Sequence, residues 1–442
     1  MARSININQL VDDQKVGSFV VTLVVLGFLA MLADGYDILA LAISAPAIIK
    51  DWGVDRAAFG PAFSASLFGI LFGAPILGWV SDRFGRKKAI VSGGLIFGAF
   101  TLACVWATSL QELVALRFLT GIGLGGLLPN TIALIAEYAP KRWRATSVIV
   151  MFSGITLGGA VPGWLAPELL PAYGWQALFV VGGLGPIMIA LLLALVLPES
   201  IKYLVLRGGR NAEAAKLASR LSGETIAADT AFTIEGGKKT PFTPALLFSG
   251  GLAAITPLLW ILFASNLMAN YFINSWIVTV FPATGRHDLL MFQVCGTIGG
   301  ILISFLLDRT GFVPIVILFL CGAISVSLIG QPGLPDTTHT LIVGAAGFCV
   351  LGVQFGINAI SGMIYPTAFR SNGSGWAFAI GRFGSVIGPL LGGYLLAMQL
   401  PPQNLFYAPA ISLALGFVAS LILLRCSMTR FRGLTIDDKA AG

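Results

Sequence analysis

Apolar residues form about twelve long runs along the 442-residue chain, and short polar segments separate most of them. A helix that crosses a bilayer needs about 20 consecutive, mainly apolar residues. Each run therefore predicts one membrane-spanning helix, so the pattern as a whole predicts an all-α membrane protein. The approximate limits of the runs are 17–49, 57–80, 88–108, 111–138, 145–170, 175–197, 246–281, 288–307, 312–331, 340–364, 373–398 and 404–425.

One polar segment is much longer than the others and divides the runs into six and six. We expect domains at 1–198 and 244–442, each a bundle of six helices, joined by a cytoplasmic linker at 199–243. Within the linker, small and apolar side chains recur at helical spacing, which predicts a short amphipathic helix on the cytoplasmic surface. These residues are Ala214, Leu217, Ala218 and Leu221.

Composition excludes an ordinary water-soluble enzyme. Charged residues make up 11% of the chain, against about 25% in soluble domains. The five cysteines contain no CxxC spacing, and the two histidines, His287 and His339, fall in predicted loops. We therefore expect no metal site and no cofactor.

The distribution of basic residues predicts the orientation in the membrane. Of the 27 lysines and arginines, 22 lie in the termini and the even-numbered connections, and three lie in the odd-numbered ones. Cytoplasmic loops carry the excess of basic residues, so both termini are expected in the cytoplasm. Because these charges border many spans instead of gathering on one face, we expect a lipid bilayer and no nucleic acid as the partner.

The two halves of the chain repeat each other at an offset of 226 residues. Asp82-Arg83-Phe84-Gly85, after the second run, matches Asp308-Arg309-Thr310-Gly311, after the eighth. The further matches are Pro140 with Pro366, Arg144 with Arg370, and Gly158 with Gly384. Parallel six-helix repeats are one architecture of secondary transporters, with the solute site between the halves.

Three motifs resemble the major facilitator superfamily: the segment 78–88 (GWVSDRFGRKK), the segment 117–123 (RFLTGIG) and Pro198-Glu199-Ser200. A narrower resemblance lies in the first run, where Asp34-Gly35-Tyr36-Asp37 is similar to the aromatic acid:proton symporters of that superfamily. The resemblance implies an importer of benzoate-like or hydroxybenzoate-like anions in the bacterial inner membrane, and we expect a monomer. It implies roles in coupling, gating or binding for Asp34, Asp37, Asp82, Arg117, Glu137, Arg370 and Arg382.

Asp34 and Asp37 also stand out by themselves. Both lie near the middle of the first run, and their spacing places them on one helix face. A charge at that depth costs at least about 2.5–3.5 kcal/mol unless it is paired, hydrated or protonated. Two neighbouring carboxylates suit a group that takes up and releases protons, and pairing with an arginine is the structural alternative. Gly35 would let the helix break or let a ligand approach the backbone.

Two arginines are predicted inside spans. Arg382 lies about eight residues into the eleventh run, where its guanidinium could clamp a carboxylate or form a structural ion pair. Arg117 lies closer to the end of its run, so it could bind substrate or extend toward the surface.

Asparagines at positions 266, 270 and 274 form one stripe of the seventh run. Their amides could bind the hydroxyl groups of a ligand or join helices. We place Asn270, Asn274 and Tyr365 among the candidate substrate contacts, although bulky rings are so common in this chain that membrane-facing bulk is the favoured account of any one of them, Tyr365 included.

Charges at predicted cytoplasmic helix ends suit contacts that hold the transporter closed. We assign this gating role to Asp82, Arg86, Glu137, Arg144 and Arg370. Solvated helix-end charges are the alternative, and they account well for the neighbouring lysines.

The main rival functions lack their motifs. No GxSxG, HExxH or GxxxxGK[ST] occurs, which disfavours a membrane hydrolase or an ATP-driven pump. A channel stays open as an alternative, although buried charges of both signs favour alternating access. Among transporters, a porter for a sugar or another organic solute is the alternative to an aromatic acid symporter.

Overall fold

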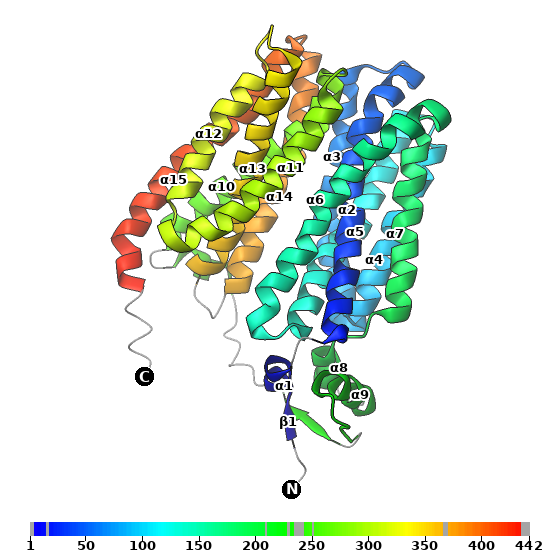
Figure 1. Cartoon of the computed structure of the whole chain (residues 1–442), viewed down its shortest axis with the longest axis vertical. Coiled ribbons are helices and arrows are strands. Elements are labelled where there is room, and N and C mark those ends of the chain that lie inside the picture. Colours follow the sequence, from blue (N-terminus) through cyan, green and yellow to red (C-terminus); the bar gives the residue numbers. More distant parts are fainter. Residues whose placement is uncertain are drawn as a thin grey trace. The chain divides into compact units, whose positions relative to one another are not determined.

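The computed structural model describes residues 4–14, 17–207, 210–227, 230–233, 243–249, 252–365 and 370–434. Almost all described elements are helices, and Figure 1 shows how the chain passes through them. Eleven described helices are long and apolar enough to cross a membrane, and α12 is a shorter apolar helix. The all-α membrane fold predicted from the apolar runs is confirmed.

The twelve long helices follow the predicted runs closely. In the first half they are α2 (Ser18–Trp52), α3 (Gly60–Phe84), α4 (Arg86–Ala103), α5 (Leu110–Tyr138), α6 (Lys141–Tyr173) and α7 (Gln176–Val196). In the second half they are α10 (Leu252–Val280), α11 (Gly285–Thr310), α12 (Val313–Ile329), α13 (Asp336–Ile364), α14 (Arg370–Ala397) and α15 (Tyr407–Leu434). Four short 3₁₀ helices accompany them: η1 (Arg56–Phe59), η2 (Cys104–Trp106), η3 (Pro244–Phe248) and η4 (Pro402–Phe406).

Contacts divide the chain into two compact units. Unit 1 comprises Met1–Ser44 and Ala65–Lys238, and unit 2 comprises Ala45–Ser64 and Lys239–Gly442. Within unit 2, the hydroxyl of Ser64 donates to the carbonyl of Val386 at 2.8 Å. The ring of Phe63 lies 5.2 Å from that of Trp276. Polar and aromatic contacts therefore attach the segment 45–64 to α10 and α14.

Glycine packing confirms the internal repeat. In unit 1, a Cβ on Gly121 would collide with the carbonyl oxygen of Ser66, so α5 and α3 meet backbone to backbone. The residues 226 positions later repeat this contact, because a Cβ on Gly347 would collide with the carbonyl oxygen of Phe292. Gly73 and Gly299 form a second matched pair of such contacts. Small residues let membrane helices approach this closely.

The linker and the N-terminus together form a small substructure, here called the N-terminal cap (Figure 1). It comprises β1 (Ser4–Asn6), α1 (Ile7–Asp13), α8 (Ile201–Arg207), α9 (Asn211–Ser222) and β2 (Ala231–Thr233). The two strands pair in parallel, with Ser4 opposite Ala231 and Asn6 opposite Thr233.

The predicted amphipathic helix in the linker is α9. Its residues Ala214, Ala218 and Leu221 are buried in one apolar cluster with Ile7 and Val11 of α1. The cluster continues through α8 into the helices of unit 1. The apolar face of α9 therefore packs inside the protein, against the N-terminal helix.

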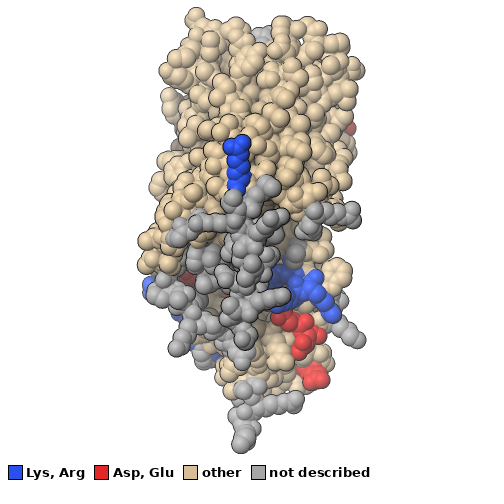
Figure 2. All heavy atoms as spheres, turned by 90° about the vertical axis from the view of Figure 1, so that its left-hand side faces the viewer, with Lys and Arg blue, Asp and Glu red and all other residues tan. Residues whose placement is uncertain are grey.

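Charged side chains avoid most of the visible surface in Figure 2. On that face most of the upper part is uncharged, apart from a basic side chain above mid-height and a small acidic spot at the right-hand edge, and the other described charges lie in the lower half. Such a wide uncharged surface matches the apolar interior of a bilayer.

The predicted location of the histidines is wrong. His287 lies in the first turn of α11 and His339 in the first turn of α13, instead of in loops. Polar residues dominate both first turns, which hid the helix starts in the sequence pattern.

Candidate functional site

The centre of unit 1 contains a buried ion pair between α2 and α5. The two terminal nitrogens of Arg117 donate to the two carboxylate oxygens of Asp37 at 2.6 and 2.7 Å. Both side chains are 2% exposed. This bidentate geometry is the strongest that an arginine and a carboxylate form.

Two hydroxyl groups complete the surroundings of the ion pair. Thr101 of α4 donates to the carboxylate of Asp37 at 3.3 Å. Arg117 donates to the hydroxyl of Ser66 of α3 at 3.2 Å. The Nε of Arg117 is buried and has no partner among the described residues. The guanidinium thus holds one more hydrogen-bond donor than its surroundings satisfy.

The burial of Arg117 decides between the two sequence-based interpretations of its position. A side chain that is 2% exposed and paired at 2.6 Å does not extend toward the surface. Taking two charges out of water costs several kcal/mol per ion, which the attraction between them only partly offsets. A pair of this kind is therefore poor support for the stability of the fold.

Asp34 lies one turn before Asp37 and is only partly buried, so the two acids have different surroundings. Of the two roles suggested for Gly35, a helix break does not occur, because α2 is continuous from Ser18 to Trp52. A Cβ on Gly35 would collide with the carbonyl of Ile155, so this glycine serves the close approach of α6 to α2. Tyr36 is held by a 2.9 Å hydrogen bond from its hydroxyl to the carbonyl of Leu178.

In unit 2, Arg382 of α14 is partly buried and has no acidic partner among the described residues. Its guanidinium carbon lies 4.9 Å from the centre of the Phe378 ring. A terminal nitrogen lies 3.5 Å from the hydroxyl of Tyr271, at the outer limit of a hydrogen bond. A cation beside two aromatic rings, without a carboxylate, is a suitable receptor for an anion.

The amides of α10 form hydrogen bonds within unit 2. Asn274 donates to the carbonyl and to the side-chain oxygen of Asn270, at 2.8 and 3.0 Å. Gln293 of α11 donates to Asn274 at 2.8 Å. Asn266 donates to Gln354 of α13 at 2.9 Å. These amides therefore join α10 to its neighbours, while Asn270 keeps a partly exposed side chain.

Tyr365, the third candidate substrate contact besides Asn270 and Asn274, lies at the C-terminal end of α13 and is 1% exposed. Its hydroxyl donates to Thr256 at 3.3 Å, and its ring fills the space where a Cβ on Gly373 would lie. Burial raises the pKa of Tyr365 above its ordinary value, which keeps the hydroxyl neutral. Contact with a ligand would require α13 and α14 to separate here.

Several predicted gating residues meet at the ends of α4, α5 and α7. Arg86 forms a 2.6 Å ion pair with Glu137, which also accepts a hydrogen bond from Ser200. Glu199 accepts from the backbone of Lys87 at 3.2 Å. The sequence interpretation assigned Glu199 and Ser200 no role, although their position directly after the sixth span was the available signal.

The other predicted gating residues lie apart from this network. Asp82 is exposed, and within the described chain it has no ion pair or hydrogen bond. Arg144 pairs with Asp12 at 3.6 Å, with both side chains about 40% exposed. The side chain of Arg370 lies outside the described part of the structure.

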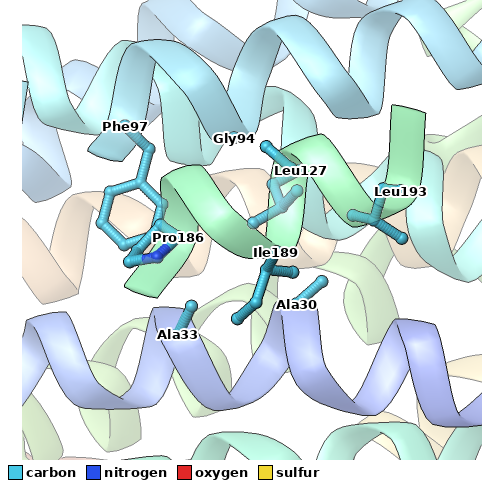
Figure 3. Close-up of a pocket in the computed structure, with 9 residues that line it drawn as sticks. Ala30, Ala33, Gly94, Phe97, Leu127, Pro186, Ile189 and Leu193 are labelled. Carbon is cyan, nitrogen blue, oxygen red and sulfur yellow. The ribbon is translucent and has the colours of Figure 1, made fainter. Parts of the chain in front are cut away.

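A small apolar pocket in unit 1 is too small and too apolar for a substrate. It lies between α2, α4, α5 and α7 and measures about 10 Å³, close to the space that one water occupies. Figure 3 shows that only apolar side chains, among them Phe97, Leu127 and Ile189, point into it. A larger hollow of about 340 Å³ on α11, α12 and α13 has no charged lining residue.

Comparison with known proteins identifies the family. Residues 23–357 match the model of the Major Facilitator Superfamily, which is most of the chain. The chain belongs to the Major Facilitator Superfamily. Proteins of this superfamily are transporters and not enzymes, and the histidines, cysteines and acids of the described residues form no metal-binding group of three or more.

Several relatives in this superfamily match over nearly their whole length. The 4-hydroxybenzoate transporter PcaK of Acinetobacter baylyi is 36% identical over 438 residues, covering 95% of each chain. The gallate transporter of Pseudomonas putida is 34% identical, covering 94% of this chain and 95% of its own. The benzoate transport protein of Acinetobacter baylyi is 32% identical, covering 96% and 93%. The family resemblance seen in the sequence is confirmed.

Solved structures agree on the fold. The xylose transporter XylE from E. coli, in a partially occluded inward-open conformation, matches with a TM-score of 0.71 at 17% identity. The match covers 92% of this chain and 98% of XylE. A bacterial homologue of the human lysosomal transporter Spinster, inward-facing and unoccupied, matches with a TM-score of 0.66. The major facilitator fold is therefore shared, whatever these proteins carry.

Proposed function

We propose that this protein is a proton-coupled symporter that imports an aromatic carboxylate, such as benzoate or a hydroxybenzoate, across the bacterial inner membrane. The buried Asp37–Arg117 ion pair carries the proposal, because it joins a protonatable acid to a cation out of reach of water. Relatives named for 4-hydroxybenzoate, gallate and benzoate support the substrate class. Each of these three compounds is a benzene ring that bears one carboxylate.

Arg382 is the first candidate for binding the substrate carboxylate. It offers a planar fork of N–H groups, and the adjacent Phe378 offers a ring against which an aromatic substrate can pack. A charged hydrogen bond contributes about 1.5–3 kcal/mol. Asn270 and Tyr365 are the secondary candidates, and Asn274 orients Asn270.

Proton coupling follows from competition for the guanidinium of Arg117. When Asp37 takes up a proton, it loses its charge and its hold on Arg117, whose Nε already lacks a partner. Arg117, the second candidate cation after Arg382, is then free to attract an anion, so proton and anion are taken up together. Asp34, partly exposed and one turn away, is suited to pass the proton to Asp37.

The remaining assignments rest on charge and position. The bias of 22 basic residues to three supports cytoplasmic termini, and we assume a monomer. The linker region 199–243 separates bundles 1–198 and 244–442. The contacts of Arg86, Glu137 and Arg144 are suited to stabilising one state of the transport cycle, with Asp82 and Arg370 as further gating candidates.

Uptake into proteoliposomes tests the coupling. Uptake of 4-hydroxybenzoate should rise when the outside is acidified and should collapse with a protonophore. Asp37→Asn should abolish accumulation while leaving exchange of substrate measurable, because the neutral amide mimics the protonated acid. Accumulation that ignores both pH and the protonophore would falsify proton coupling.

Calorimetry tests the substrate site. Arg382→Ala should weaken binding of 4-hydroxybenzoate about 10- to 100-fold, since about 1.4 kcal/mol corresponds to tenfold, and Arg382→Lys should recover part of it. Arg56→Ala removes an exposed arginine and serves as the matched control. If Arg382→Ala binds 4-hydroxybenzoate as tightly as the wild type does, the anion site lies at Arg117 instead. If xylose displaces 4-hydroxybenzoate from the protein, the result favours a sugar porter.

A further inference from the structure

A second buried acid–base pair lies in unit 2, far along the chain from Asp37. Asp288 in the first turn of α11 is 0% exposed, and His339 in the first turn of α13 is 6% exposed. The ring Nδ1 of His339 lies 3.1 Å from Oδ2 of Asp288, an ion-pair distance, but these two atoms do not form a hydrogen bond. Thr340 donates to the other carboxylate oxygen at 2.6 Å. No part of the proposed transport site uses these residues.

The contacts of the histidine ring determine how many protons it carries. Its Nε2 faces the carbonyl oxygen of Ile329 at 3.1 Å, and its Nδ1 faces a carboxylate. Both neighbours can only accept hydrogen bonds. In either neutral tautomer, one ring nitrogen would therefore direct a lone pair at another acceptor. A ring with both protons donates to the carbonyl of Ile329 and places a positive charge beside the ionised carboxylate.

The electrostatic surroundings favour the same state. A carboxylate with no exposure needs a compensating positive charge, and no lysine or arginine pairs with Asp288 among the described residues. Ile329 is the last residue of α12, where free carbonyls attract a cation. The ring of Phe281 lies 4.4 Å from that of His339 and can interact with a charged imidazole.

Other ionisable groups at this end of unit 2 lie outside the pair. The residues that α10 and α12 place against the ring, Phe281 and Ile329, carry no charge. In the described chain, no ion pair joins His339 or Asp288 to any of the remaining groups here. These groups are Arg286, His287, Asp336 and Tyr407.

We infer that His339 and Asp288 form a proton-binding site, in which a doubly protonated imidazole links the ends of α11, α12 and α13. Loss of this proton leaves the buried carboxylate uncompensated and sets a lone pair against an acceptor. The link therefore holds at acidic and neutral pH and weakens as the pH rises. The inference is independent of transport and stands whether or not proton coupling does.

The chain offers a sharp test because it contains only two histidines. Full-length protein labelled with ¹⁵N-histidine gives two sets of ring signals, and His287→Gln assigns them by removing the exposed one. We expect the His339 ring of the wild-type protein to show the signals of a doubly protonated imidazole at neutral pH.

Asp288→Asn should make the His339 ring release its second proton at lower pH, whereas Asp336→Asn, at an exposed acid, should not. In thermal unfolding between about pH 6 and pH 9, wild type should lose more of its midpoint temperature than His339→Gln does. A His339 ring that carries one proton at neutral pH in the wild type overturns the inference. That spectrum needs no variant at the pair and decides the matter even if Asp288→Asn fails to fold.

Discussion

Unit 1 and unit 2 share backbone packing but differ in the chemistry at their centres. Gly121 lies against the backbone carbonyl of Ser66 in unit 1, and Gly347 lies against that of Phe292 at the equivalent positions of unit 2. Arg117 of unit 1, however, corresponds at the offset of 226 to Val343 of unit 2, which is fully buried. Ser66, which accepts a hydrogen bond from Arg117, corresponds to the buried Phe292.

The same contrast holds along α2 and α10. Gly158 contacts the carbonyl of Leu32, and Gly384 makes the matching contact with Ala264. Five residues further along each helix stand Asp37 in unit 1 and the buried Ala269 in unit 2. The positions that hold the Asp37–Arg117 pair in unit 1 are thus apolar in unit 2, although both units share the glycine contacts.

The largest expected effect comes from breaking the ion pair on one side. Arg117→Met leaves a buried carboxylate uncompensated and should lower the free energy of unfolding by about 3–5 kcal/mol. The double variant Asp37→Leu/Arg117→Met gives unit 1 the apolar centre of unit 2 and should recover most of that loss. Thermal unfolding in detergent measures the stability, and uptake should stay absent in both. If the double variant transports normally, the proposed role of the Asp37–Arg117 pair in transport is wrong.

The glycine contacts should be equally important in both units. Gly121→Ala and Gly347→Ala each force a methyl group into a backbone carbonyl and should cost about 1–3 kcal/mol through overpacking. Gly78 and Gly375 have open space around them, so alanine there should be neutral or slightly stabilising. Melting temperatures of the four variants test this. If Gly121→Ala lowers the melting temperature strongly and Gly347→Ala does not, the two geometrically equivalent contacts contribute differently to stability.

The smallest expected effect is the difference in stability between alanine variants of two glycines at equivalent positions, Gly85 and Gly311. Gly85 and Gly311 both have positive φ, at 104° and 65°. A Cβ on Gly85 would also collide with the carboxylate of Glu199, whereas Gly311 has open space around it. Gly311→Ala should therefore cost about 1 kcal/mol of backbone strain, and Gly85→Ala more. Equal melting temperatures for the two variants would show that the contact with Glu199 contributes nothing.

The sequence pattern predicted the elements better than their contacts. Run length located the spans, because a bilayer sets a minimum helix length, and the offset of 226 identified equivalent positions before any contact was known. The positions of Asp37 and Arg382 within their spans could also be predicted, since residue number measures distance along a helix. The partner of Asp37 was not, because Arg117 lies 80 residues away and its direction depends on how α2 and α5 pack.

Other misses have similar causes. Helix α2 does not break at Gly35. The absence of a side chain there instead lets the carbonyl of Ile155 pack closely against this helix. Polar first turns led both histidines to be placed in loops. The amphipathic pattern of α9 was clear, but nothing in the sequence showed that the N-terminal helix α1 would cover it.

The strand pairing in the N-terminal cap sets an order of events during synthesis. Ser4–Asn6 leaves the ribosome first, yet its partner Ala231–Thr233 appears only after six spans have been made. At about 5–20 residues per second, the first strand waits roughly 10–45 s for its partner. The cap can therefore close only on a chain whose first six spans are complete, which makes its closure a marker of a finished first half.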